Sequence, residues 1–220
     1  MLHQHKLFLK LEKCQFEQKK VEYLGLIISK DHIEMDPKKI QGILSWPTPK
    51  SVKDVHLFLG FVNFYCHFIR GFSDIARPLN NLTWKAKRWD WLKQEEDALS
   101  MLKKAITSAP SLIFPSDAGR FPLECDASGY ATGAVLSQLQ KDGHYHPMGF
   151  MSKGFSDVKQ NYQIYDKELL VIICALEEWR HFLEGATSPF EIFTDHQNLS
   201  YFHSSQKLNR HQACWSLYLS

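Results

Sequence analysis

Apolar and polar residues follow a strand-like pattern near both ends of the chain and a helix-like pattern between them. Residues 6–30 are predicted to form the edge of a sheet, because the run KVEYLGLIIS is rich in β-formers and is interrupted by Gly25, which indicates a tight turn or a close approach of the backbone. Between residues 37 and 109, apolar residues recur at helical spacing and prolines separate the stretches. We therefore expect a small helical subdomain there, without strands of its own.

Residues that start and stop helices divide this middle region. Asp36 is placed to cap a helix that must end near Trp46, because prolines follow. Ser51 is placed to cap the next helix, with an acid three residues later as a variant of the capping box. The helical pattern that follows is expected to break at Gly71 and at Pro78.

After residue 120 the pattern changes to that of a sheet. The turn signal Lys141-Asp142-Gly143 separates two apolar runs and predicts a hairpin. The predicted elements are strands at 121–126, 132–140, 144–153 and 190–195, a long helix over 156–184 and short helical stretches at 197–204 and 209–220. A hairpin sheet followed by a helix and another strand is a mixed α/β order.

The composition limits the class of protein. Of the 220 residues, 44% are hydrophobic and 23% charged, as in ordinary globular proteins. No apolar run approaches the roughly 18 residues of a membrane span, and the charged N-terminus does not resemble a secretory signal. The five cysteines are odd in number and never form a C-x-x-C pair, which favours reduced thiols over a disulfide framework or a zinc site. We expect an intracellular protein.

The formal net charge of +2 is unevenly distributed. Residues 1–115 carry 18 lysines and arginines against 12 aspartates and glutamates, a balance of +6. Residues 116–220 carry 8 against 12, a balance of −4. Charge alone leaves two interpretations open: chance variation between solvated surfaces, or a basic half that binds a polyanion and an acidic half that binds a divalent cation.

Three acids of the C-terminal half are candidates for such a cation site. Asp126 and Asp195 each end a predicted strand, where a carboxylate is unfavourable unless a cation meets it. Glu168 lies beside the expected buried stripe of the long helix, whereas Asp166 and Glu177 are expected nearer to solvent. That stripe consists of Tyr162, Tyr165, Leu169, Ile172, Ile173 and Leu176.

Convergence of the three carboxylates would have a chemical consequence. Mutual repulsion would favour their protonation, and Mg²⁺, a hard ion that prefers oxygen ligands, would relieve it. Two such ions about 4 Å apart can activate a water and stabilise the leaving oxygen of a phosphodiester. Spacing alone leaves another interpretation open, in which the aspartates initiate turns and Glu168 is solvated.

Several long motifs resemble one family. The segments CDASGYATGAVLSQ, NYQIYDKELLVIICALEEWRHFLEGA, FEIFTDHQNLSYF and LNRHQACWSLYLS resemble the ribonuclease H domain of gypsy-type LTR-retrotransposon reverse transcriptases. In that family the metal-binding catalytic acids are the Asp of the DAS strand, the Glu of KEL and the Asp of TDH, which correspond here to Asp126, Glu168 and Asp195. The resemblance implies Mg²⁺ or Mn²⁺ as cofactor, an RNA–DNA hybrid as substrate, and a location in a cytoplasmic particle or the nucleus.

The upstream segments resemble the same Pol polyprotein. KCQF and VEYLGLIIS resemble the end of the palm with its primer-gripping hairpin, which would place Tyr23 and Gly25 near a template-primer. DPKKIQGILSWPTPKSVKDVHLFLGFVNFYCHFIRGFSDIARPL resembles the thumb and connection, with Lys50, Lys53 and Arg70 as candidate contacts to the hybrid backbone. The implied divisions are a palm end at 1–35, a thumb/connection at 36–115 and a ribonuclease H-like domain at 116–220.

The resemblance is incomplete in two ways. The polymerase of this family uses paired aspartates, and no Asp-Asp pair occurs in these 220 residues. The family's ribonuclease H domain continues with a fifth strand and a helix that brings a fourth acid, and this sequence stops at Ser220. We expect an α+β fold with a C-terminally truncated ribonuclease H-like domain that works with other parts of the polyprotein. The alternative is a catalytically decayed nucleic-acid-binding or structural protein derived from a retroelement.

Overall fold

The first sheet is an antiparallel meander that a distant segment completes. The computed structural model describes residues 8, 10, 12, 14, 16–85, 87–116, 120–184, 189–195 and 210–219. Within them the first sheet has the order β1-β2-β3-β4. Its strands are β1 (Lys20–Tyr23), β2 (Leu26–Ser29), β3 (His32–Met35) and β4 (Leu112–Ile113). Because β4 follows the helical region in sequence, the chain returns to this sheet after leaving it.

The turn between β1 and β2 explains the glycine in the N-terminal run. Leu24 and Gly25 both have positive φ, of 50° and 82°, as a two-residue hairpin turn of type I′ requires. The Tyr65 hydroxyl donates a hydrogen bond to the Gly25 carbonyl at 3.3 Å. A Cβ at Gly25 would lie 2.7 Å from that hydroxyl oxygen, so both the conformation and the close approach favour glycine here.

The middle region is helical, as predicted. Its helices are α1 (Pro37–Leu44), α2 (Val52–Asn63), a 3₁₀-helix (Cys66–Phe68), α3 (Phe72–Leu82) and α4 (Lys93–Thr107). The side chain of Asp36 accepts from the Lys38 amide at 2.9 Å, and Ser51 accepts from the Asp54 amide at 3.3 Å, so both predicted caps are confirmed.

The expected break at Pro78 is wrong. Pro78 lies inside α3, which continues past it to Leu82. A proline removes one amide donor from a helix, but packing can hold the helix together around it. Here Ala76 and Leu79 on either side of the proline are fully buried, so tertiary contacts outweigh the local cost.

The second sheet is mixed, in the order β7-β6-β5-β8. Its strands are β5 (Pro122–Ala127), β6 (Ala131–Leu139), β7 (Tyr145–Gly154) and β8 (Glu191–Phe193). β5 pairs antiparallel with β6 and parallel with β8, and β6 pairs antiparallel with β7. The predicted hairpin turn is confirmed, with Gly143 at a φ of 80°.

The single long helix expected over 156–184 is wrong, because three helices occupy this stretch. They are α5 (Asp157–Gln160), α6 (Ile164–Glu178) and α7 (Arg180–Leu183). Gln163 is extended, with φ −62° and ψ 154°, and separates α5 from α6. Such a local departure from helical geometry leaves the periodicity of the apolar residues almost unchanged, so the pattern did not indicate it.

The expected buried stripe is also wrong at its N-terminal end. Tyr165 is 39% exposed, whereas Asp166 is only 8% exposed. The reason is that α6 is covered on more than one side: the Gln212 side chain on α8 (Arg210–Leu219) donates to the Asp166 carboxylate at 2.8 Å. The other expected helical stretch near this end, 197–204, lies outside the described residues.

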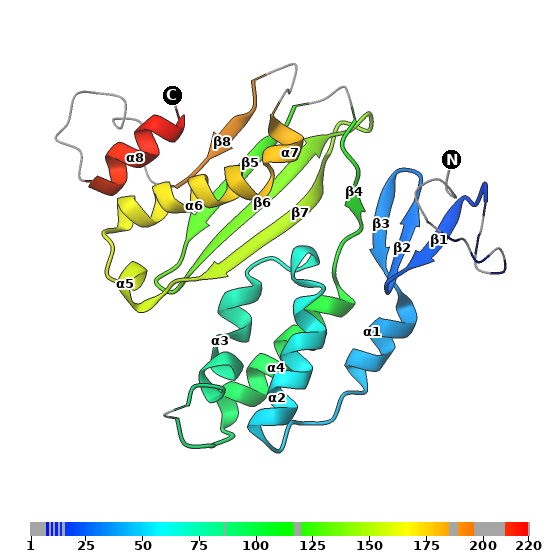
Figure 1. Ribbon diagram of the computed structural model, residues 1–220, viewed down its shortest axis with the longest axis vertical. Coiled ribbons are helices and arrows are strands. Elements are labelled where there is room, and N and C mark those ends of the chain that lie inside the picture. The colour runs from blue at the N-terminus through cyan, green and yellow to red at the C-terminus, as the bar shows by residue number, and fades with distance from the viewer. Residues whose placement is uncertain are drawn as a thin grey trace.

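The central part of the second sheet contributes to two different clusters of buried residues, one on each face (Figure 1). On one face α6 packs over Leu123, Leu136 and Met151, and we call this cluster the sheet core. On the other face Val135 and Phe150 join the apolar residues of α2, α3 and α4, and we call this cluster the helical core. No helix in the described part of the chain is long and apolar enough to cross a membrane.

Candidate metal centre

Asp126 and Asp195 are brought together by the parallel pairing of β5 and β8. The register pairs Leu123 with Ile192 and Glu124 with Phe193. Continued by two residues, that register places Asp126 opposite Asp195, on the same face of the sheet, because side chains alternate along strands. Asp126 lies in β5, and Asp195 follows β8 by two residues. Both carboxylates are exposed to solvent.

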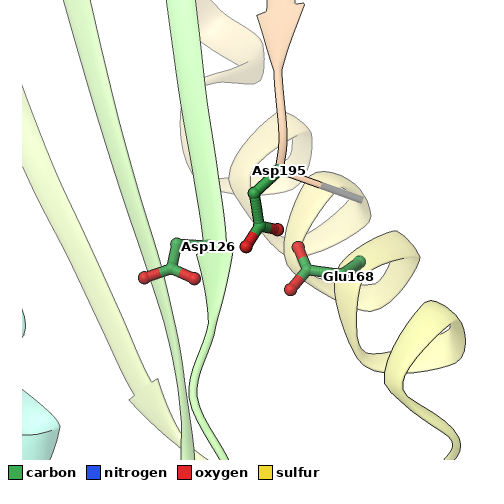
Figure 2. A group of neighbouring side chains, drawn as sticks. All are labelled: Asp126, Glu168 and Asp195. Carbon is green, nitrogen blue, oxygen red and sulfur yellow. The ribbon is translucent and has the colours of Figure 1, made fainter. Parts of the chain in front are cut away.

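Glu168 approaches the two aspartates from the second turn of α6. Its side chain is buried, at 2% exposure. One carboxylate oxygen accepts from the Ala127 amide at 3.1 Å and the other accepts from the Thr194 hydroxyl at 3.2 Å. The ends of both strands therefore orient this carboxylate, and Figure 2 shows it directed toward the two aspartates.

The three carboxylates form one compact acidic group. One oxygen of each lies within 4.8 Å of the others. Burial, and next the charge of Asp195, raise the pKa of Glu168, although the hydrogen bonds from Thr194 and Ala127 act in the opposite direction. Among the described residues, no lysine or arginine forms an ion pair with any of the three. The arrangement could hold a metal ion, since its donors are the oxygens that hard divalent cations prefer.

Cys125, beside Asp126, is part of the packing and not of this group of ligands. Burial, and next the charge of Glu168, raise the pKa of its thiol to about 12. A thiol must lose its proton to bind a metal, so this residue stays neutral within the sheet core.

The five candidate nucleic-acid contacts lie in three parts of the fold: the first hairpin, the start of α2 and the segment before α3. Lys50 and Lys53 are exposed at the start of α2, and Tyr23 is exposed in the first hairpin. Gly25 has a structural reason for its identity in the contact with Tyr65. Arg70 lies near the acidic group: it pairs with Glu124 at 3.5 Å and lines a small cavity of about 100 Å³ together with Asp126.

Two residues support the acidic group without having been predicted. Ser128 accepts from the amides of Tyr130 and Ala131, at 3.1 and 2.9 Å, and lies 3.0 Å from the Asp74 carboxylate, so it fixes the turn after β5 and joins it to α3. A serine after a strand is a known turn signal and could have been found. The partnership of Thr194 with Glu168 spans separate elements, and no local pattern encodes it.

Comparison with known proteins identifies the family of the C-terminal part of the chain. Residues 117–220 match the family described as "RNase H-like domain found in reverse transcriptase". The polyproteins of transposons Tf2-3 and Tf2-4 from Schizosaccharomyces pombe are each 39% identical over 215 residues, which are 97% of this chain and 16% of each polyprotein. Residues 117–220 belong to the RNase H-like domains of reverse transcriptases. The whole chain thus spans about a sixth of the length of these curated relatives.

Solved structures share the fold of the RNase H-like domain and of the region before it. The foamy viral protease-reverse transcriptase in complex with RNA/DNA hybrid is 21% identical, with a TM-score of 0.73, over 96% of this chain and 29% of that one. The same enzyme in complex with dsDNA is 19% identical, with a TM-score of 0.75, over 96% of this chain and 44% of that one. At these identities the likeness establishes the fold alone.

Proposed function

We propose that the chain binds an RNA–DNA hybrid and hydrolyses its RNA strand, using Mg²⁺ or Mn²⁺ held by Asp126, Glu168 and Asp195. The observation that carries this proposal is the convergence of three carboxylates, one of them buried, with which no lysine or arginine of the described residues forms an ion pair. A structural role alone would favour a lysine or arginine among them.

The donor set fits a divalent cation of the hard class. All three ligands are carboxylates, and two of them are exposed, so the group is open to solvent and to a substrate. When bound there, a pair of such ions supplies an activated water and stabilises the charge that develops on a phosphodiester.

The residues of the chain prepare this site. The Ala127 amide and the Thr194 hydroxyl hold Glu168 in one orientation, so ligand binding does not have to order it. Asp126 and Asp195 project from adjacent parallel strands, whose pairing fixes their separation. The raised pKa of Glu168 means that metal binding competes with a proton at this carboxylate.

The upstream region is proposed to bind the hybrid. Support comes from the +6 balance of residues 1–115 and from the likeness in fold to the foamy viral protease-reverse transcriptase, whose structures hold an RNA/DNA hybrid or dsDNA. We retain the division into 1–35, 36–115 and 116–220, with the refinement that Leu112 and Ile113 pair with β3.

Metal-dependent stability tests the site directly. The native chain is expected to melt at higher temperature as Mg²⁺ is added, by an amount equivalent to about 2.7 kcal/mol when Mg²⁺ reaches a hundred times its dissociation constant. Asp126→Asn keeps the shape and removes one charge, so it should lose most of this gain and all hybrid cleavage. Without metal it should be at least as stable as the native chain, because repulsion of Glu168 is reduced.

Glu191→Gln is the matched control, since it removes an exposed carboxylate of β8 outside the acidic group. It should respond to Mg²⁺ as the native chain does. Equal responses of the native chain and Asp126→Asn would show that Asp126 is not a metal ligand. A normal metal response without cleavage of any hybrid would instead favour a protein that binds nucleic acid but no longer hydrolyses it.

A further inference from the structure

A second cavity, of about 380 Å³, lies where α3 meets the end of the second sheet. One side of it is formed by α3 and the segment after it, and the other by the turn after β5, the end of β7 and α5. Its lining residues are Ser73, Arg77, Asn80, Asn81, Trp84, Lys87, Tyr130, Gly154, Phe155 and Gln160. Strands β5 and β7 run in the same direction, so the end of β7 that forms the cavity lies at the same end of the sheet as the end of β5, which carries Asp126 (Figure 1).

The lining is cationic and rich in amides. It includes Arg77 and Lys87, and none of its ten residues is an aspartate or glutamate. Among the described residues, Lys87 forms no ion pair, and the side chains of Asn80 and Asn81 form no hydrogen bond. Two cations and two free amides around one cavity suit an anion that accepts several hydrogen bonds.

Arg77 is held in place by an aromatic ring and forms no ion pair with any residue that the structure describes. Its guanidinium carbon lies 3.2 Å from the centre of the Tyr130 ring, a cation–π contact that fixes the side chain and leaves its charge in place. Arg70, two residues before α3, differs in that it pairs with Glu124. The positive charge of Arg77 is therefore available to a ligand.

An exposed aromatic ring stands at the edge of the cavity. Trp84, just after α3, is 60% exposed although it is the largest kind of apolar side chain. The segment that follows it contains Lys85, Lys87 and Arg88, all exposed. A flat ring beside unpaired cations is the combination that binds a nucleotide base together with its phosphate.

The cavity is joined rigidly to the acidic group. The Ser73 amide donates to the Ser152 hydroxyl on β7 at 3.0 Å, and Ser128 lies 3.0 Å from the Asp74 carboxylate. The first contact fixes α3 against β7, and the second fixes it against the turn that follows β5. A strand that enters the cavity would thus have a fixed position relative to the metal centre.

We infer that this cavity binds the backbone of a nucleic-acid strand, with Arg77 and Lys87 at a phosphate and Trp84 stacked on a base. The inference rests on the proposed binding of a hybrid and adds to it a specific contact site on the α3 side of the sheet. The site lies outside the candidate contacts Lys50, Lys53 and Arg70.

The test compares two lysines of one segment. Anisotropy of a labelled RNA–DNA hybrid is titrated with the native chain, Lys87→Gln and Lys85→Gln, without divalent metal so that no cleavage occurs. Both lysines are exposed and each substitution removes one positive charge, but only Lys87 lines the cavity. Lys87→Gln should weaken binding about tenfold and reduce the slope of log K against log salt by about one, and Lys85→Gln should have a clearly smaller effect.

A second arm locates the contact on the nucleic acid. Hybrids carrying one neutral methylphosphonate at successive positions of either strand are bound by the native chain and by Lys87→Gln. One position should weaken binding of the native chain and leave Lys87→Gln unaffected, because the partner of that phosphate is already gone. Trp84→Ala should weaken binding several-fold and Trp84→Phe less, as stacking requires.

The outcomes separate the two proposals. If the native chain binds the hybrid but the two lysine variants weaken binding equally and no methylphosphonate position is coupled to Lys87, the cavity is not the contact site and the proposed function stands. If the native chain binds no hybrid at any salt concentration, both proposals are wrong. Unchanged melting temperatures of the variants establish that a loss of binding does not come from unfolding.

Discussion

Glu168 lies in surroundings very different from water. It is a carboxylate almost without solvent contact, faced by a second carboxylate, and it is held by one amide and one hydroxyl. Two hydrogen bonds compensate part of the lost hydration, but they do not supply a positive charge. In the metal-free protein the protonated form of Glu168 is therefore favoured. A cation that replaces this proton would stabilise the folded state.

The pH dependence of stability should reveal this acid. Because burial and Asp195 raise the pKa of Glu168 above its ordinary value of 4.5, the folded chain holds a proton that the unfolded chain releases. This contribution therefore disfavours folding as pH rises from 4.5 through the pKa of the folded state. Glu168→Gln resembles the protonated acid, so its stability should lack this dependence on pH.

The measurement is the melting temperature between pH 4.5 and pH 8 in EDTA. The difference between the native chain and Glu168→Gln should move against the native chain as pH rises and then level off. Excess Mg²⁺ should reverse the sign near pH 8, because only the native chain gains a ligand. Parallel curves in EDTA would show that Glu168 titrates as it does in the unfolded chain.

At the scale of elements, the sequence correctly predicted features that depend on contacts between residues close in sequence. The caps by Asp36 and Ser51 and the hairpin at Gly143 are of this kind, and all three are present. The convergence of the three acids was expected from the resemblance, because strand-end spacing alone also allowed turn-initiating aspartates and a solvated Glu168. The continuation of α3 through Pro78 and the burial of Asp166 were not, since both depend on packing with segments distant in sequence.

Two separate effects favour glycine at position 25 in the β1–β2 turn, namely its positive φ and the close approach of Tyr65. A pair of substitutions can measure them separately. Gly25→Ala places a side chain at positive φ, which costs roughly 1 kcal/mol, and adds a clash with the Tyr65 hydroxyl. Gly71→Ala meets only the first cost, because its φ of 65° is also positive but its Cβ would meet open space. Urea denaturation should show a loss of about 1 kcal/mol for Gly71→Ala and a larger loss for Gly25→Ala.

Tyr65→Phe, combined with Gly25→Ala in a double-mutant cycle, measures the cost of the clash between an alanine side chain at position 25 and the Tyr65 hydroxyl. In that background Gly25→Ala should cost about as much as Gly71→Ala, because the hydroxyl oxygen is absent. If Gly25→Ala costs no more than Gly71→Ala in the native background, the turn relaxes away from Tyr65 and the close approach does not matter.

At the scale of the whole molecule, the second sheet belongs to two cores at once. Neighbouring residues of β7 point to opposite faces, so Phe150 packs in the helical core and Met151 in the sheet core. The 3₁₀-helix and α3 both contact β7 directly. Division of the chain near residue 115 would therefore expose apolar surface on both parts, and the helical region is expected to need the sheet for its stability.

Amide hydrogen exchange in variants at two adjacent residues of β7 tests whether the helical region depends on the sheet for its stability. Phe150→Ala removes a large side chain from the helical core and should cost roughly 3 to 5 kcal/mol, while Met151→Ala should cost roughly 2 to 5 kcal/mol in the sheet core. Because local openings follow the loss of local packing, Phe150→Ala should accelerate exchange in α3 more than in α6, and Met151→Ala should do the reverse. The substitutions lie one residue apart on one strand, so a general weakening of β7 would affect both helices alike in each variant. If α3 exchanges in Phe150→Ala at its native rate, the helical region is stable without this face of the sheet, and the fixed relation between the α3 cavity and the metal centre loses its main support.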